Sequence, residues 1–181
     1  QRAGLAKSVD DLSTRERYRR AKQLVDSWGY EAARTEWELL VDIPRYEQEA
    51  RWNLGEIGLR KLRDRPVEAE AIFGELANSD YREAEKALYY LARAQMRQEK
   101  YDDARKTFEI YKKRYPRGRY ALLADYYGGW LYYDHRENEK ALVGLKAFID
   151  KHGVWARKIT YITGFYAWAL MRLERWEEAI D

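Results

Sequence analysis

The sequence contains no cysteine, only three prolines and only two histidines among its 181 residues. Without cysteine the chain can form no disulfide and no thiolate site, but its compartment stays open because proteins of any compartment can lack cysteine. No run approaches the roughly 18 to 20 apolar residues that a membrane-spanning helix needs. The first residues, QRAGLAKSVDDLS, also lack the apolar core of a signal peptide. We therefore predict no direct membrane span.

An excess of one charge sign is also lacking. The 34 basic and 31 acidic residues leave a formal net charge of +3, and they are interspersed rather than grouped in blocks. This mixing is typical of a solvated surface, so we expect no nucleic-acid partner. Because 46% of the residues are hydrophobic, we predict a single folded domain over residues 1–181. The final LERWEEAID starts a new helix, so we expect the chain to be a fragment of a longer protein.

The main feature that is present is an internal repeat. An alanine after a turn-like segment recurs five times, at intervals of 36, 35, 37 and 38 residues. Large residues follow it by four and seven positions, and these offsets lie on one face of a helix. In sequence order, the alanines are Ala33, Ala69, Ala104, Ala141 and Ala179, and the large residues are Trp37, Leu40, Phe73, Leu76, Phe108, Tyr111, Leu145 and Phe148.

A small residue precedes the repeated alanine by twelve positions in four copies, where it would let two helices approach closely. These residues are Ala21, Ala92, Gly129 and Ala167. The second copy has Ile57 there, between Gly55 and Gly58. We therefore expect the first helix of this copy to be shifted in register.

The repeat predicts helical hairpins and no sheet, because no segment alternates apolar and polar residues. The expected helices lie near residues 14–27, 30–42, 46–62, 66–78, 81–98, 101–115, 118–135, 138–151 and 154–173, with a tenth from about Trp176. Ser13 with Glu16, and Asp80 with Glu83, have the spacing of capping boxes at helix starts. One hairpin cannot bury its apolar face alone, so we expect neighbouring hairpins to stack into a curved array.

The segment ALYYLARAQMRQEKYDDARKTFEIYKKRYPRG, residues 87–118, resembles a tetratricopeptide repeat (TPR). The positions that match the spacing of this family are Leu88, Leu91, Ala92, Ala104, Phe108 and Pro116. The resemblance implies an all-α right-handed superhelix, or α-solenoid, of about five TPR-like helix-turn-helix repeats. It also implies a non-catalytic protein-protein interaction scaffold that holds a protein or peptide partner in its concave groove.

A second resemblance concerns RERYRRAKQLVDSWGYEAARTEWELLV, residues 15–41, which is similar to the superhelical, non-catalytic part of soluble lytic transglycosylases. The connection YPRGRYA, residues 115–121, is similar to repeat proteins of the Tol-Pal system and of outer-membrane protein assembly. These resemblances imply a periplasmic or cell-envelope location, with the cytoplasm as the alternative, and peptidoglycan as a further partner. The alternative function is an accessory domain of a lytic transglycosylase, because the Glu-Ser and Gly-Leu-Met-Gln catalytic segments of that family are absent here.

No residue pattern indicates chemistry in this chain. His135 and His152 lie near predicted helix ends without a spaced set of metal ligands, so we expect them to cap helices or face solvent. Paired acids such as Asp102-Asp103 open second helices, where negative charge complements the helix dipole. We predict that the chain is no enzyme and has no catalytic, cofactor-binding or metal site.

The seven Trp and sixteen Tyr residues exceed what the repeat positions require. First helices line the inner curve of such arrays, so we predict a partner-binding groove there. Its residues are Tyr89, Arg93, Tyr126, Trp130, Tyr133, Trp168 and Met171. The alternative is that these rings only fill the core between helices.

Two further features each allow two interpretations. Gly128-Gly129 inside a predicted helix indicates close packing against the preceding helix pair, or a hinge or close ligand approach. Lys86, Arg93 and Arg97 could form a basic strip for an acidic peptide, or could be neutralised by neighbours such as Glu83 and Glu85.

Overall fold

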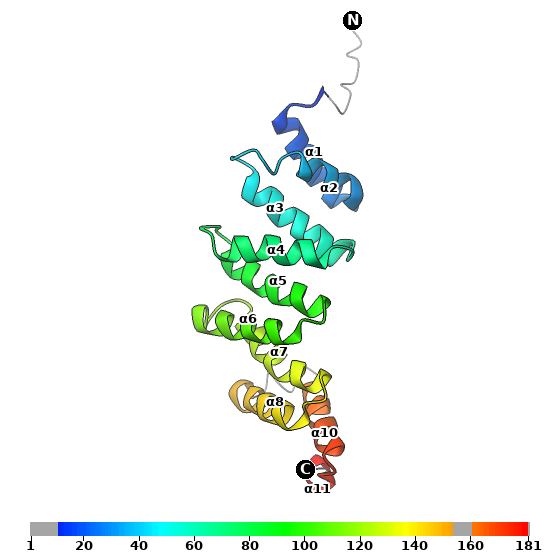
Figure 1. Ribbon diagram of the computed structural model, residues 1–181, viewed down its shortest axis with the longest axis vertical. Coiled ribbons are helices and arrows are strands. Elements are labelled where there is room, and N and C mark those ends of the chain that lie inside the picture. The colour runs from blue at the N-terminus through cyan, green and yellow to red at the C-terminus, as the bar shows by residue number, and fades with distance from the viewer. Residues whose placement is uncertain (1–10, 154–160, 181) are drawn as a thin grey trace, which may run out of the picture. The chain divides into compact units, whose positions relative to one another are not determined.

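The structure, a computed structural model, describes residues 11–153 and 161–180, and its regular elements in these ranges are all helices (Figure 1). They are α1 (Thr14–Asp26), α2 (Tyr30–Glu38), α3 (Glu47–Glu56), the π-helical η2 (Ile57–Lys61), α4 (Pro66–Ala77), α5 (Ala84–Arg97), α6 (Tyr101–Arg114), α7 (Ala121–Asp134), α8 (Asn138–His152), α10 (Ile162–Arg172) and α11 (Trp176–Ile180). The chain divides into two compact units, Gln1–Ala87 and Leu88–Asp181, with the boundary inside α5.

The predicted all-α fold of stacked helix-turn-helix repeats is confirmed, and most helix ends lie within a few residues of their predicted positions. The largest differences are that α2 ends at Glu38 instead of residue 42, and that α5 and α7 each begin three residues late. The predicted start at residue 154 lies outside the described residues, whereas α10 covers the second part of that helix. The extent of one domain over residues 1–181 stays a prediction.

In the first unit, α1 pairs with α2, α2 contacts α3, and α3 pairs with α4. The repeat positions point into this unit's core, where Ala21, Ala33 and Trp37 have no exposed surface. Burying such apolar faces between consecutive hairpins stabilises a repeat array, because a lone hairpin would leave them in water.

The two predicted capping boxes have different outcomes. At the start of α1, the Ser13 hydroxyl accepts a hydrogen bond from the Glu16 backbone N–H, and the Glu16 carboxylate accepts one from the Ser13 backbone N–H. The second box is wrong, because α5 begins at Ala84 and the Asp80 carboxylate instead accepts a hydrogen bond from Gln48 at 2.9 Å. The Asp80 carboxylate, which the local spacing assigned to the helix start, is therefore bound by a side chain that is distant in the sequence.

The register shift predicted for the second copy has a structural cause in η2. The Leu62 backbone N–H donates to the Ile57 carbonyl at 2.9 Å, a bond to the fifth preceding residue that widens one helical turn. The close approach occurs at Gly55, where an added Cβ would lie 3.0 Å from the Phe73 ring. Ile57, at the position that is small in other copies, is 2% exposed and fills the core.

Among the residues that the structure describes, five other than glycine adopt positive φ values, and each follows the first helix of a hairpin. They are Trp28 (67°), Arg63 (64°), Glu99 (60°), Arg136 (59°) and Glu174 (60°). In four of these turns, the next backbone N–H donates to the carbonyl five residues earlier, at 2.8 to 3.0 Å, which is the bond of a Schellman motif. Their spacing of 35 to 38 residues gives a backbone marker of the same five repeats.

In the second unit, α6 packs on α7, α7 on α8, and α8 on α10. The α7–α8 crossing is close, because an added Cβ on Gly129 would lie 2.7 Å from the Leu145 backbone nitrogen. Close packing therefore explains Gly129, but the contact is with α8 of its own hairpin, so the predicted contact with the preceding pair is wrong for Gly129. The small residue allows this approach because it removes the side chain from the interface.

Candidate functional site

The seven predicted groove residues lie on α5, α7 and α10 of the second unit, the first helices of three consecutive hairpins, and we call them the aromatic face. Trp168 is 57% exposed and Met171 39%. Arg93 is exposed as well, whereas Tyr126, Trp130 and Tyr133 are partly buried. Most of these side chains therefore have a surface that a partner could contact.

Tyr89 departs from this pattern because it is only 3% exposed. Its ring stacks on Tyr120 with centroids 4.4 Å apart and an interplanar angle of 9°, and it also contacts Phe108. Its hydroxyl accepts a hydrogen bond from Arg93 at 3.0 Å. Tyr89 thus fills the core, as in the alternative interpretation, and positions the Arg93 guanidinium on the surface.

Tyr127 is a member of this region that the sequence prediction missed. The Arg93 guanidinium lies 5.3 Å from the centroid of its ring, and the ring stacks on Phe108 at 5.2 Å. Burial raises the pKa of Tyr127 to about 12, although the nearby Arg93 charge opposes this rise. The Trp130 ring forms a T-shaped pair with the same ring, and the two centroids lie 6.0 Å apart. Position 127 precedes Trp130 by three residues, and this spacing on one helical face could have revealed it.

A pocket of about 330 Å³ lies at the α10 end of the aromatic face, and we call it the Gly164 pocket. Its lining residues are Tyr133, Tyr161, Gly164, Phe165, Trp168 and Arg172. Tyr133 reaches it from α7, and its ring lies 4.9 Å from that of Phe165. The structure thus brings together two predicted residues, Tyr133 and Trp168, from adjacent first helices.

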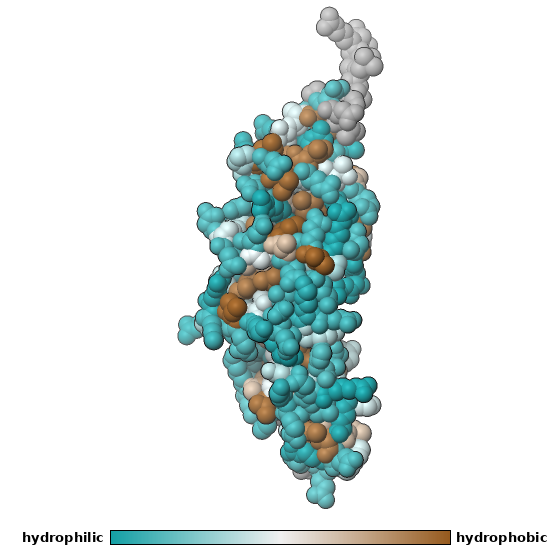
Figure 2. Space-filling model, in the orientation of Figure 1, coloured by the Kyte–Doolittle hydropathy of each residue, from teal (hydrophilic) through white to brown (hydrophobic). Residues whose placement is uncertain are grey.

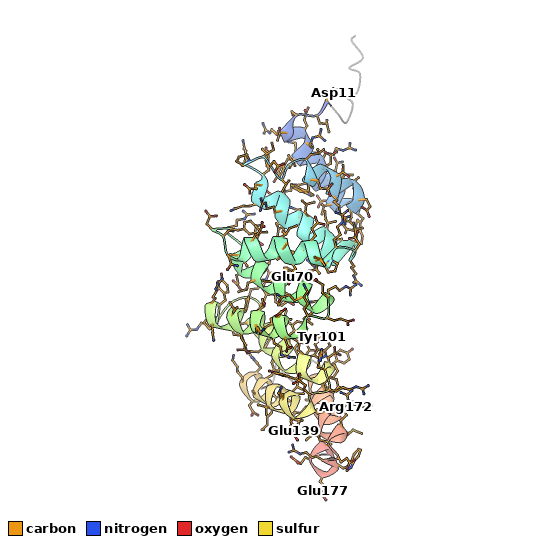
Figure 3. The ribbon with its side chains drawn as sticks, viewed as in Figure 1. Asp11, Glu70, Tyr101, Glu139, Arg172 and Glu177 are labelled. Carbon is orange, nitrogen blue, oxygen red and sulfur yellow. The ribbon has the colours of Figure 1, made fainter. Side chains whose placement is uncertain are left out.

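Arg172, which is labelled in Figure 3 on α10, forms a wall of this pocket. Its guanidinium lies 4.4 Å from the centroid of the Tyr133 ring and donates a hydrogen bond to the Tyr133 carbonyl at 3.2 Å. No carboxylate of the described residues lies within ion-pairing distance of it. Arg172 therefore presents a positive charge beside aromatic rings.

Exposed apolar side chains concentrate near this pocket. The visible surface in Figure 2 is mostly hydrophilic, with separate hydrophobic patches. The large hydrophobic residues of the second unit that are exposed, among those described, are Ile110, Val143, Tyr161, Trp168, Met171 and Trp176. Four of these six belong to the last hairpin, from residue 161 onward. Concentration of this kind marks interaction sites more often than scattered exposure does.

The two interpretations of the basic strip have different outcomes at Lys86 and at Arg93. Lys86 forms an ion pair with Glu83 at 3.2 Å and lies 4.1 Å from the Trp52 ring centroid, as the neutralised alternative predicts. Arg93 instead rests on the rings of Tyr89 and Tyr127. Its charge is therefore held by aromatic faces, with no acidic partner within ion-pairing distance in the described part of the chain.

The histidines and the paired acids lie at the helix ends that were predicted for them. His135 caps the end of α7, and its ring contacts Tyr101 at 4.3 Å. His152 ends α8 and is less exposed than expected, because its Nε2 lies 3.0 Å from an Asp125 carboxylate oxygen. Within the described ranges, no cluster of three or more His, Cys, Asp or Glu residues could hold a metal ion. None of the helices described is both long and apolar enough to cross a membrane.

A second cavity, of about 360 Å³, lies among α6, α7 and α8. Gly128 and Gly144 form part of its lining, and Lys151 at its edge pairs with Asp125 at 2.6 Å. An added Cβ at Gly128 would meet only the flexible Lys112 amine, at 3.8 Å. Packing therefore does not explain Gly128 as it explains Gly129.

Comparison with known proteins agrees with the repeat at α5 and α6. A family model described as "Tetratricopeptide repeat" matches residues 86–117, which coincides with the resemblance of residues 87–118. No curated protein matches the chain. TPR repeats generally bind protein partners and are typically non-catalytic. The match covers residues 86–117 of the 181 and supports a tetratricopeptide repeat at α5 and α6, and the other helical hairpins are similar to it in architecture.

Proposed function

We propose that the chain binds a protein partner through the aromatic face of its second unit. The observation that carries this proposal is Trp168, which is 57% exposed at a pocket that Tyr133 of another first helix also lines. Large aromatic side chains supply much of the binding energy in protein interfaces, because each removes a large apolar area from water and loses little conformational freedom.

The surroundings of the face hold its rings in place before binding. Tyr133 is fixed between Phe165 and the Arg172 guanidinium, and Trp130 rests against Tyr127. Side chains that are already ordered lose little further entropy when a partner binds. This arrangement supports a surface that binds a partner segment without large rearrangement.

Trp168→Ala and Trp130→Ala test the proposal. The partner is first isolated with the wild-type chain and identified, and its affinity for each variant is then titrated. We expect each substitution to weaken binding by roughly 10-fold or more, the typical effect of removing an aromatic hot spot. Ile110→Ala is the control, since Ile110 is 44% exposed on α6, outside this face. A folded double variant that keeps the wild-type affinity would defeat the proposal.

We further propose that this interaction takes place in the bacterial envelope, on the basis of the sequence resemblance of residues 15–41 and 115–121. Peptidoglycan is then a second candidate ligand, and an accessory role beside a lytic transglycosylase domain is the alternative function. The accessory role is tested by reading the full-length gene for a downstream Glu-Ser catalytic segment, and the envelope location is tested by fractionating cells. A cytoplasmic protein whose gene lacks that segment would remove this part of the proposal.

A further inference from the structure

The geometry of the Gly164 pocket indicates which kind of side chain it can hold. Tyr161 and Trp168 are seven residues apart and 70% and 57% exposed. Seven residues of α-helix rise about 10.5 Å and return to nearly the same face. A planar group placed midway would lie about 5 Å along the helix axis from either residue, a spacing comparable with the roughly 4.5 to 7 Å that separates paired aromatic rings.

Gly164 keeps the space between these rings open. It lies one turn after Tyr161 and one turn before Trp168, and an added Cβ would meet no atom within 4 Å. A glycine inside a helix costs about 1 kcal/mol relative to alanine, and no contact with the described residues explains it here. Phe165, the residue after Gly164, packs on Tyr133 and closes one side of the pocket.

Arg172 lies one helical turn after Trp168, on the same face. Its guanidinium is stacked on Tyr133, as described above, and lacks an acidic partner in the described ranges. A guanidinium held on an aromatic face keeps donors free for a carboxylate. The charge of the pocket therefore complements an acidic group beside the planar one.

We propose that the occupant is an extended partner segment that inserts an aromatic side chain over Gly164, between Tyr161 and Trp168, and places a neighbouring carboxylate on Arg172. This inference rests on the proposed function and specifies the sequence that the partner presents. The pocket volume of about 330 Å³ suits one such side chain rather than a folded surface.

Blocked tetrapeptides provide the test, with binding to the full chain followed by the NMR shifts of the Gly164 amide and the Trp168 indole. We expect acetyl-Gly-Phe-Glu-Gly-amide to bind more tightly than its Leu-Glu counterpart by about 2- to 10-fold, from ring stacking. It should bind more tightly than the Phe-Lys peptide by about 3-fold or more, from the charge on Arg172. Equal affinities, or no saturable shifts with any peptide at millimolar concentration, would overturn the proposal.

Gly164→Leu separates this inference from the broader function. The leucine side chain fills the pocket floor, so we expect at least about 10-fold weaker binding of the Phe-Glu peptide and of the isolated partner. Gly128→Leu is the matched control, because Gly128 is also a helical glycine, where an added Cβ would meet only the flexible Lys112 amine, and it lies outside this pocket. If Trp130→Ala weakens partner binding while Gly164→Leu does not, the proposal that the aromatic face binds the partner is supported and the inference about the occupant of the pocket is wrong.

Discussion

Gly128 and Gly129 are neighbours in α7 but have opposite surroundings. An added Cβ at Gly129 would lie 2.7 Å from the backbone of α8, whereas at Gly128 it would meet only the flexible Lys112 amine at 3.8 Å. We therefore predict that Gly129→Ala lowers the free energy of unfolding by about 1 to 3 kcal/mol, because backbone cannot yield as a side chain can. Gly128→Ala should raise it by up to about 1 kcal/mol through helix propensity.

Urea unfolding of the two variants beside wild type measures both effects. The opposite signs are the essential result, because they distinguish a glycine required by packing from one that packing does not require. A stability loss of equal size at both positions would show that the α7–α8 crossing differs from the one described.

The left-handed turn residues offer a second test, at Arg136. Its φ of 59° costs a residue with a Cβ about 1 to 2 kcal/mol, which glycine avoids. Glycine also raises the conformational entropy of the unfolded chain, and this offsets about 0.5 to 1 kcal/mol of the gain. We expect Arg136→Gly to stabilise the chain by about 0.5 to 1 kcal/mol in urea unfolding. Arg136→Ala keeps the Cβ and should show no gain, so equal stabilisation by both would contradict the turn geometry.

We expect the α5–α6 hairpin to depend on small residues in its core. Ala92 and Ala104 are both fully buried. We predict that Ala92→Leu and Ala104→Leu each cost about 1 to 3 kcal/mol of unfolding free energy by overpacking. Lys106→Leu, at a position whose side chain is 75% exposed, is the control and should change stability little. Wild-type melting of both alanine variants would contradict the repeat register.

Helix positions were predictable from the sequence because the apolar spacing is local and repeats five times. The second capping box was wrong because Asp80 binds Gln48, which lies 32 positions earlier in the chain. The widened turn at η2 could be predicted only as a shift in register, since the bond from Leu62 to Ile57 depends on how α3 and α4 pack.

The candidate site was partly predictable. Tyr133 and Trp168 follow from the repeat alignment, and the structure brings them to one pocket. Tyr89 lies at the repeat position equivalent to that of Tyr126 but is covered by Tyr120 from the next connection, which no helical spacing reveals. Tyr161 and Arg172 were missed, although their distances of seven and four residues from Trp168 place all three on one helical face.

Both units contain a buried tyrosine that makes folding stability depend on alkaline pH. Burial raises the pKa of Tyr81 and of Tyr127 to about 12 from the ordinary 10.0. Between these values the folded chain retains protons that the unfolded chain has released, so stability falls as pH rises through this window and is fully present below pH 10. Urea midpoints at about pH 9 and pH 11.5 should show this loss.

Phenylalanine substitutions assign that loss to individual tyrosines. Tyr81→Phe and Tyr127→Phe should each reduce the difference between the two midpoints, because neither ring can then ionise in the unfolded chain. A pH response in both variants that is identical to that of wild type would exclude buried tyrosines as its source.

The claim on which the function depends is that partners meet the chain at the aromatic face of the second unit. Photo-crosslinking in living cells tests it most directly, with a photoreactive residue at Met171 on α10 or at Val143 on α8, which are 39% and 73% exposed. We predict a discrete protein adduct from position 171 and none from position 143. Adducts formed equally from both positions, or from position 143 alone, would contradict the account.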